Sequence, residues 1–310
     1  MLGNLSGADL RALHVFVTVA ECGGFSPAQA VLNVSQPTIS VQITNLERRL
    51  GFRLCERGRT GFRLTQRGGA VLNQAKTLFG SVTEFRAEVN SLSGRLMGEL
   101  HLGVLDTTIS NGRARVPRAI AAFRARNQEV ALSLTVGSPI ELERAVIDDR
   151  MHLAIGYFGR RLELLTYETL FRETQQVYCA RDHVLFDRCP DKVSQADLER
   201  ADWVARGYPL GEDVRSYAPP NSSATASHME AIATLILSGH HIGYLPDHYA
   251  RPWVAAKELR PVLPGKLAYD VTFDLVTRKG RRRSDVLKAF LKDLKSAHDD
   301  YDDHGGRGEP

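Results

Sequence analysis

The chain has 310 residues, of which 43% are hydrophobic and 25% are charged, and its formal net charge is +4. Such a length predicts more than one domain, and this composition is that of a globular protein rather than a disordered one. No run of about 18 uncharged apolar residues occurs, so we expect no membrane helix and no membrane partner.

The N-terminus and the cysteines favour a reducing compartment. The first residues lack the basic region, apolar run and cleavage site of a secretion signal. Cys22, Cys55, Cys179 and Cys189 form neither a C-x-x-C pair nor a zinc-ligand spacing with histidine. We therefore expect free thiols, no metal site and a cytoplasmic location.

The positive charge is concentrated near the N-terminus. Residues 1–68 hold eight arginines against Asp9, Glu21, Glu47 and Glu56, an excess of +4. A local basic surface beside a near-neutral remainder indicates a polyanion partner for this part of the chain.

Three helices are predicted in this basic segment. Residues 9–22 carry apolar side chains at helical spacing, a short helix starts at Ser26 and ends near Asn33, and a longer one covers 35–51. A short helix, a tight turn around Val34 and a longer helix make a helix-turn-helix candidate.

The longer helix exposes groups suited to the DNA major groove. At about 100° per residue, Pro37, Thr38 and Val41 lie opposite the apolar stripe, with Gln36 and Ser40 on its flanks. Glutamine amides pair with adenine, hydroxyls with several bases, and backbone N–H groups with phosphate. We therefore predict that this helix reads bases.

Two short strands, "FRLCER" and "FRLT", surround the glycine turn "GRTG" and predict a hairpin, or wing. The wing carries Arg53, Arg57, Arg59 and Arg63, and arginine suits phosphate and a narrow minor groove because its planar group donates in pairs. A single arginine is more often an ordinary surface residue, but such a set directly after a helix-turn-helix favours DNA.

These residues resemble a known family. The stretch "FSPAQAVLNVSQPTISVQITNLERRLGFRLCER" and the closing "LTQRG" are similar to the winged helix-turn-helix of LysR-type transcriptional regulators. The family often has arginine at the position of Val41, where valine can meet a thymine methyl but cannot chelate guanine. The family's contact positions carry over to Gln36, Pro37, Thr38, Ser40, Arg57 and Arg59. With Val41 of the same helix face and Arg63 of the wing added, these are the predicted DNA-binding residues, in a DNA-binding domain of residues 1–68.

A long helix is predicted over residues 65–94, with Thr65 as a cap. Its apolar residues step by four and three, the spacing of a coiled-coil seam, so we expect a second copy of the helix to cover them. Packing on the protein's own body is the alternative. In LysR-type regulators this segment is the dimerising linker helix. The predicted dimerisation residues are Val71, Ala75, Leu78, Val82, Phe85, Val89 and Leu92.

Residues 98–298 alternate between predicted strands and helices, a pattern typical of mostly parallel sheets. This part resembles the effector-binding domain of LysR-type regulators, which has two periplasmic-binding-protein-like lobes. The resemblance implies a first lobe over 98–170 and 271–298 and a second over 171–270. Residues 299–310 are expected to be a flexible acidic tail.

Ligands of open α/β sheets bind beyond the carboxyl ends of strands, near helix N-termini that favour anions. Hydroxyls there also serve as plain N-caps, so both interpretations stay open. His152, His240 and His241 depart from the family pattern, and their roles are open as well. By resemblance, the predicted effector-binding residues are Thr107, Thr108, Ser110, Ser138 and Arg206. His228 and His241 are added to this set, because Arg206 with either histidine would favour a carboxylate.

The sequence thus predicts an α/β protein with a winged helix-turn-helix, a linker helix and a two-lobed effector domain. We expect a sequence-specific transcriptional regulator without a cofactor, a homodimer or homotetramer on double-stranded promoter DNA, modulated by a small molecule between the lobes. The alternative is a solute-binding or enzymatic two-lobed domain with no DNA role. We expect no enzyme, because no G-x-S-x-G, P-loop or strand-to-helix G-x-G-x-x-G motif and no metal cluster occurs.

Overall fold

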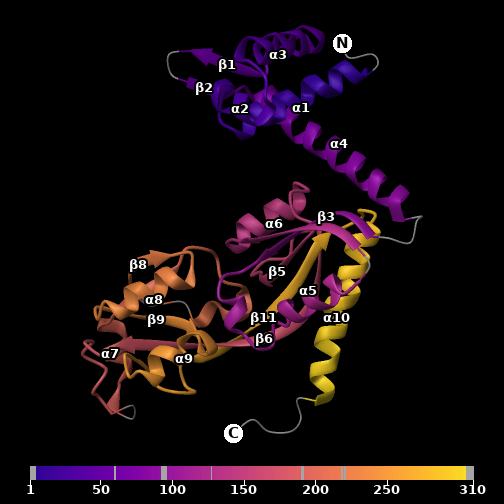
Figure 1. Cartoon of the computed structure of the whole chain (residues 1–310). Coiled ribbons are helices and arrows are strands. Elements are labelled where there is room, and N and C mark those ends of the chain that lie inside the picture. The colour runs from indigo at the N-terminus through magenta and orange to yellow at the C-terminus, as the bar shows by residue number, and fades with distance from the viewer. Residues whose placement is uncertain are drawn as a thin grey trace. The chain divides into compact units, whose positions relative to one another are not determined.

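The computed structural model describes residues 5–58, 61–91, 96–126, 128–189, 192–217, 219 and 221–304. The chain divides into two units, Met1–Arg86 and Ala87–Pro310 (Figure 1). Each unit has its own buried core. None of the helices in these ranges combines the length and apolarity that a membrane span requires.

The first unit begins with three helices and a hairpin: α1 (Gly7–Glu21), α2 (Phe25–Leu32), α3 (Gln36–Leu50), β1 (Cys55–Gly58) and β2 (Gly61–Leu64). A capping box starts α1, in which the Ser6 hydroxyl accepts from the Asp9 N–H and the Asp9 carboxylate accepts from the Ser6 N–H. Helix α2 starts at Phe25, one residue before the predicted Ser26, with Gly24 as its N-cap, and Asn33 ends it in the left-handed region. Gly51, also left-handed with φ 80°, ends α3 as predicted.

The buried stripe of α3 holds the first unit together. Ile39 and Ile43 are fully buried and Leu46 is nearly so, against Phe16 and Val19 of α1. Burying each such side chain stabilises the fold by about 1.5–3 kcal/mol, so the orientation of α3 is strongly determined. Its opposite face is thereby directed to solvent.

Two hydrogen-bonded contacts position the wing and the helix that follows it. The Glu47 carboxylate of α3 accepts the N–H groups of Leu54 (2.8 Å) and Cys55 (3.3 Å), where β1 begins. The Thr65 hydroxyl accepts the N–H of Gly68 at 2.9 Å and so caps α4 (Gln66–Ser91), as predicted. A Cβ on Gly68 would lie 1.8 Å from the Leu54 carbonyl oxygen, so this close approach requires glycine.

The second unit contains a mixed sheet with helices packed on it. Its strands are β3 (Leu96–Val104), β4 (Gln128–Val136), β5 (Leu153–Tyr157), β6 (Leu165–Ala180), β7 (Asp202–Arg206), β8 (Ser222–Ala226), β9 (His241–Pro246), β10 (Leu259–Pro261) and β11 (Ala268–Arg278). The helices are α5 (Val116–Arg124), α6 (Pro139–Ile147), α7 (Gln195–Arg200), α8 (Met229–Leu237), α9 (Asp247–Ala255) and α10 (Asp285–His304), with short 3₁₀ turns η1 (Thr108–Ser110) and η3 (Glu212–Tyr217).

Two long strands join the two lobes of this unit. The strand order in the described residues is β4-β3-β5-β11-β6-β9-β7-β8, with β10 also on β6. Strands β4, β3 and β5 pair in parallel in the first lobe, and β8, β7 and β9 do so in the second. Strands β6 and β11 pair antiparallel and run through both lobes (Figure 1). The prediction of mostly parallel sheets was therefore wrong, because the chain crosses between the lobes twice, in opposite directions.

The segment predicted to be a flexible tail, 299–310, begins as helix. Helix α10 continues to His304, and residues 305–310 lie outside the described residues. Upstream, α10 buries Phe290 and Leu294 against the first lobe, so an anchored helix leads into this segment.

Candidate nucleic-acid interface and ligand pocket

The solvent face of α3 carries all the side chains predicted to read bases. Gln36, Pro37, Thr38 and Val41 are exposed, and Ser40 is half-buried. The exposed fraction of Val41 is 58%, which is large for an apolar side chain. This face presents an amide, hydroxyls and a methyl surface together.

The N-terminus of α3 is held by hydrogen bonds from its surroundings. The Gln29 side-chain oxygen accepts the Gln36 N–H at 3.1 Å, and the Ser35 and Thr38 hydroxyls lie 2.8 Å apart. Within the described part of the chain, the Gln36 amide itself has no hydrogen-bond partner. A fixed backbone with a free amide is the arrangement that base recognition requires.

The arginines of this unit have different environments. Arg63 on β2 is exposed, whereas its neighbour Phe62 turns inward, with its ring 5.9 Å from that of Phe25. Arg49 forms an ion pair with Asp9 at 2.9 Å. Arg53 is exposed. The guanidinium carbon of Arg67 lies over the Phe52 ring, 5.3 Å from its centroid. Of the predicted DNA contacts, Arg59 and the side chain of Arg57 lie outside the described part of the chain.

The predicted seam of α4 divides into two halves. Val71, Ala75 and Leu78 pack on the core of the first unit, and Ala75 is 3% exposed. Packing on the protein's own body, the alternative raised from the sequence, therefore describes this half. The remaining seam residues Val82, Phe85 and Val89 are 44%, 66% and 48% exposed, and Leu92 lies outside the described residues.

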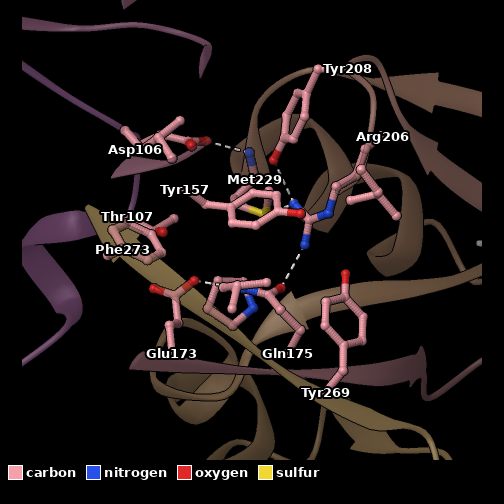
Figure 2. A pocket seen from close by; sticks show the side chains of 14 residues that line it. Asp106, Thr107, Tyr157, Glu173, Gln175, Arg206, Tyr208, Met229, Tyr269 and Phe273 are labelled. Carbon is pink, nitrogen blue, oxygen red and sulfur yellow. Dashed lines mark hydrogen bonds between the residues drawn. The ribbon is translucent and has the colours of Figure 1, made fainter. Parts of the chain in front are cut away.

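A cavity lies between the two lobes of the second unit (Figure 2). Asp106 and Thr107 reach it from the segment after β3, Glu173 and Gln175 from β6, and Arg206 from the end of β7. Tyrosines complete much of its wall. It leaves about 20 Å³ for the centres of water molecules, which is room for about one or two waters.

Arg206 has only neutral hydrogen-bond partners in the structure as described. Its guanidinium donates to the side-chain oxygen of Gln175 at 2.6 Å, to the Tyr208 hydroxyl at 3.0 Å and to the Met229 sulfur at 3.1 Å. Arg206 is partly buried. A partly buried guanidinium without a carboxylate has lost solvation that two parallel bonds to a carboxylate would replace.

Two carboxylates line the same cavity. Asp106 accepts the backbone N–H of Met229 at the start of α8 and lies 3.8 Å from the His228 ring. Burial raises the pKa of Asp106, although the Met229 N–H and the charges of His228 and Arg206 oppose this. Glu173 is 4% exposed and accepts the Gln175 amide at 2.6 Å.

The predicted effector-binding residues separate in the structure. Thr107 and Arg206 line the cavity. Thr108 is buried and donates to the Leu105 carbonyl at 2.6 Å, and Ser138 caps α6 in a capping box with Glu141, so both hydroxyls have local structural partners.

The other predicted residues lie outside the cavity lining. Ser110 contacts the His248 ring at 3.0 Å across the lobes, and His228 lies beside Asp106. His241 Nδ1 is buried and has no hydrogen-bond partner among the described residues. Of the two further histidines left open, His240 is exposed and His152 Nδ1 accepts the backbone N–H of His101 at 2.9 Å.

The cavity contains polar residues that the sequence did not single out. Glu173 and Gln175 lie two residues apart on β6 and are both buried, 4% and 3% exposed. Burial alternates from Phe171 to Val177, so Glu173 and Gln175 share the buried face of the strand with these apolar residues.

Family models match both units. One, described as a bacterial regulatory helix-turn-helix protein of the lysR family, matches residues 10–69. Another, described as the LysR substrate binding domain, matches residues 93–299. The chain belongs to the LysR family. It is a DNA-binding transcriptional regulator with an effector-binding domain and not an enzyme, which confirms the predicted fold and function.

Similar proteins agree with this assignment. The chain is 40% identical over 292 residues to the HTH-type transcriptional activator BauR of Pseudomonas aeruginosa, covering 94% of this chain and 96% of that one. It is 28% identical to the SDS degradation transcriptional activation protein of a Pseudomonas species, covering 91% and 94%.

Solved structures share the fold. Full-length CbnR in complex with its target DNA matches with a TM-score of 0.64 at 21% identity, covering 93% of this chain and 99% of that one. Full-length LysG from Corynebacterium glutamicum, with bound effector Arg, matches with a TM-score of 0.56 at 17% identity, covering 94% and 98%. At these identities the likeness extends to the fold alone.

Proposed function

We propose that this LysR-family regulator reads promoter DNA with the solvent face of α3 and controls that binding through a small carboxylate held by Arg206. The observation that carries the effector half of the proposal is the Arg206 guanidinium, whose described partners are all neutral, in the cavity between the lobes. A carboxylate is the ligand that completes such a group.

The DNA half rests on the side chains of the first unit. Gln36, Thr38 and Ser40 offer hydrogen bonds to bases, Val41 offers contact with a thymine methyl, and Arg63 offers charge to phosphate. Arg57 and Arg59 belong to the proposal by their place in the wing. The proposed units are a DNA-binding domain over 1–68, a linker helix over 65–94 and an effector domain over 98–298 with the lobes given above.

The oligomer in this proposal is a homodimer formed by α4. Val82, Phe85 and Val89 are the exposed part of the seam, and a copy of the same helix matches their spacing. A dimer presents two recognition helices to two half-sites. A homotetramer would follow from additional contacts between effector domains. We propose a cytoplasmic location, where the promoters of a bacterium lie.

The proposed signal is a change in lobe closure. Contacts between the lobes, such as Asp106 with Met229 and Tyr157 with Gly211, hold the cavity closed. A ligand shifts the balance between closed and open lobes only by its differential affinity for the two. In the proposed oligomer, lobe closure would then change the angle between the pairs of DNA-binding domains.

Fluorescence anisotropy with the DNA that flanks the protein's own gene tests the proposal. We expect specific binding over two or more half-sites, with an affinity that falls steeply as salt is raised. Absence of binding to this or any other DNA at low salt would remove the DNA-reading role. Addition of short carboxylates in the same assay tests the effector half.

A further inference from the structure

The charged groups of the cavity are separated within it. Figure 2 shows Arg206 on one side and Asp106 with Glu173 on the other, with the Tyr157 ring between them. Arg206 belongs to the second lobe, Asp106 follows β3 of the first, and Glu173 lies on the β6 crossover. The cavity therefore has a positive end and a negative end.

Each charged end has unused capacity for a ligand. Arg206 lacks an acidic partner among the residues described. Of the Asp106 oxygens, Oδ2 accepts the Met229 N–H, and no described group donates to Oδ1. Glu173 has donors in Gln175, Asn111 and His248, but its partners are amides and an imidazole rather than a permanent cation.

Single-charge ligands leave one end uncompensated. A plain carboxylate would pair with Arg206 but add a third negative charge to a partly buried cavity that already holds Asp106 and Glu173. A plain amine would pair with the acids and leave Arg206 as it is. Like charges in a poorly solvated cavity repel strongly, and an unpaired buried charge is costly. A molecule with one group of each sign satisfies both ends.

We propose that the effector is a small amino-carboxylate whose carboxylate binds Arg206 and whose ammonium group binds at Asp106 and Glu173. This inference rests on the proposed effector function of the cavity and specifies its ligand class. An ammonium group donates three hydrogen bonds, and Asp106 Oδ1, Glu173 and the Thr107 hydroxyl are the acceptors on that side. In this structure the cavity has room for only about one or two waters, so the lobes must separate to admit the effector, and the tyrosine walls favour a short, unbranched carbon chain.

Isothermal titration calorimetry on the full-length protein tests the ligand class. The probes are γ-aminobutyrate, butyrate and butylamine, the shorter and longer members of each series, and the corresponding α-amino acids. We expect at least one amino acid to bind ~10-fold or more tightly than the carboxylate and the amine of the same chain. If the plain carboxylate bound as tightly as the amino acid of the same chain length, the zwitterion inference would be overturned and the proposed carboxylate effector would stand. The inference would also be overturned if the plain amine bound as tightly as the amino acid, or if none of the probes bound.

Isosteric variants locate the two ends. Asp106→Asn keeps an oxygen for the Met229 N–H, and we expect it to weaken amino-acid binding by ~10- to 100-fold while butyrate binds as before or better. Arg206→Met should abolish the binding of both. Glu230→Gln, an exposed acid next to Met229 on α8, is the matched control and should change neither.

The outcomes separate the two proposals. Loss of amino-acid and butyrate binding in equal measure in Asp106→Asn, with thermal unfolding unchanged, would overturn the assignment of the ammonium end. Glu173→Gln serves as the second variant if Asp106→Asn does not fold. Unchanged binding in Arg206→Met would place the ligand elsewhere and overturn the proposed function together with this inference.

Discussion

Replacing Phe85 by alanine tests whether the exposed half of the α4 seam is a dimer interface. Phe85 is 66% exposed. Since fully burying such a side chain contributes about 1.5–3 kcal/mol, roughly 1–2 kcal/mol is available from Phe85 when a partner helix covers it. A symmetric dimer buries the residue twice, so Phe85→Ala should weaken the dimer by about 2–4 kcal/mol. This corresponds to a ~30- to 700-fold rise in the dimer dissociation constant.

Sedimentation velocity over a dilution series measures this constant. Thr83→Ala is the matched control, because Thr83 is exposed on another face of the same helix and its hydroxyl bonds within the helix to the Phe79 carbonyl. We expect the control to dissociate like the wild type. DNA binding should weaken in Phe85→Ala at concentrations where the dimer dissociates, and recover at higher protein concentration.

The reasoning fails if Phe85→Ala and Thr83→Ala dissociate alike. In that case the exposed half of the seam would not be part of the dimer, and Val82 and Val89 would need another explanation. An unchanged thermal unfolding midpoint of the first unit is expected in both variants, since the buried half of the seam holds α4 on that unit.

Further variants address DNA reading, effector binding and pH. Gln36→Ala should reduce discrimination between specific and non-specific DNA in the anisotropy assay, and equal loss on both would contradict its base-reading role. Arg63→Ala should weaken binding to all sequences alike and reduce the salt slope by about 1; an unchanged slope would argue against a phosphate contact. Arg206→Lys should lose the response to the effector but keep DNA binding, because lysine lacks the planar paired donors; a full response would contradict this. Burial, with the neighbouring His101, lowers the pKa of His152 from 6.5 to about 4. The folded state therefore binds fewer protons than the unfolded state between these pH values, and stability is lost as pH falls. Between pH 7 and pH 5, the free energy of unfolding measured with urea should fall by about 2 kcal/mol less in His152→Gln than in the wild type. Equal falls in the two proteins would contradict the assignment.

The sequence alone determined the DNA-binding unit almost completely. Its signals are local: Ser35 before α3, Gly51 after it, the buried stripe between them, and glycines around the wing. Helix ends and amphipathic faces depend on neighbours within a few residues, so a motif of this kind carries its own structure. The same is true of the Thr65 cap of α4.

The tertiary structure decided which residues share the ligand cavity. Asp106, Glu173 and Arg206 are far apart in the chain and meet only because β6 crosses between the lobes. Predicted positions such as Thr108 and Ser138 have the right residue type, but their hydroxyls are used by local bonds. No local pattern distinguishes a capping hydroxyl from one that faces a ligand.

The seam of α4 shows the same division within a single helix. Its four-three spacing predicts an apolar stripe over its whole length, and this stripe is present. Periodicity determines which side chains share a face, but not what covers that face. Only the tertiary structure shows that Val71, Ala75 and Leu78 are covered by the first unit while Phe85 stays exposed, because burial depends on segments that the spacing does not describe.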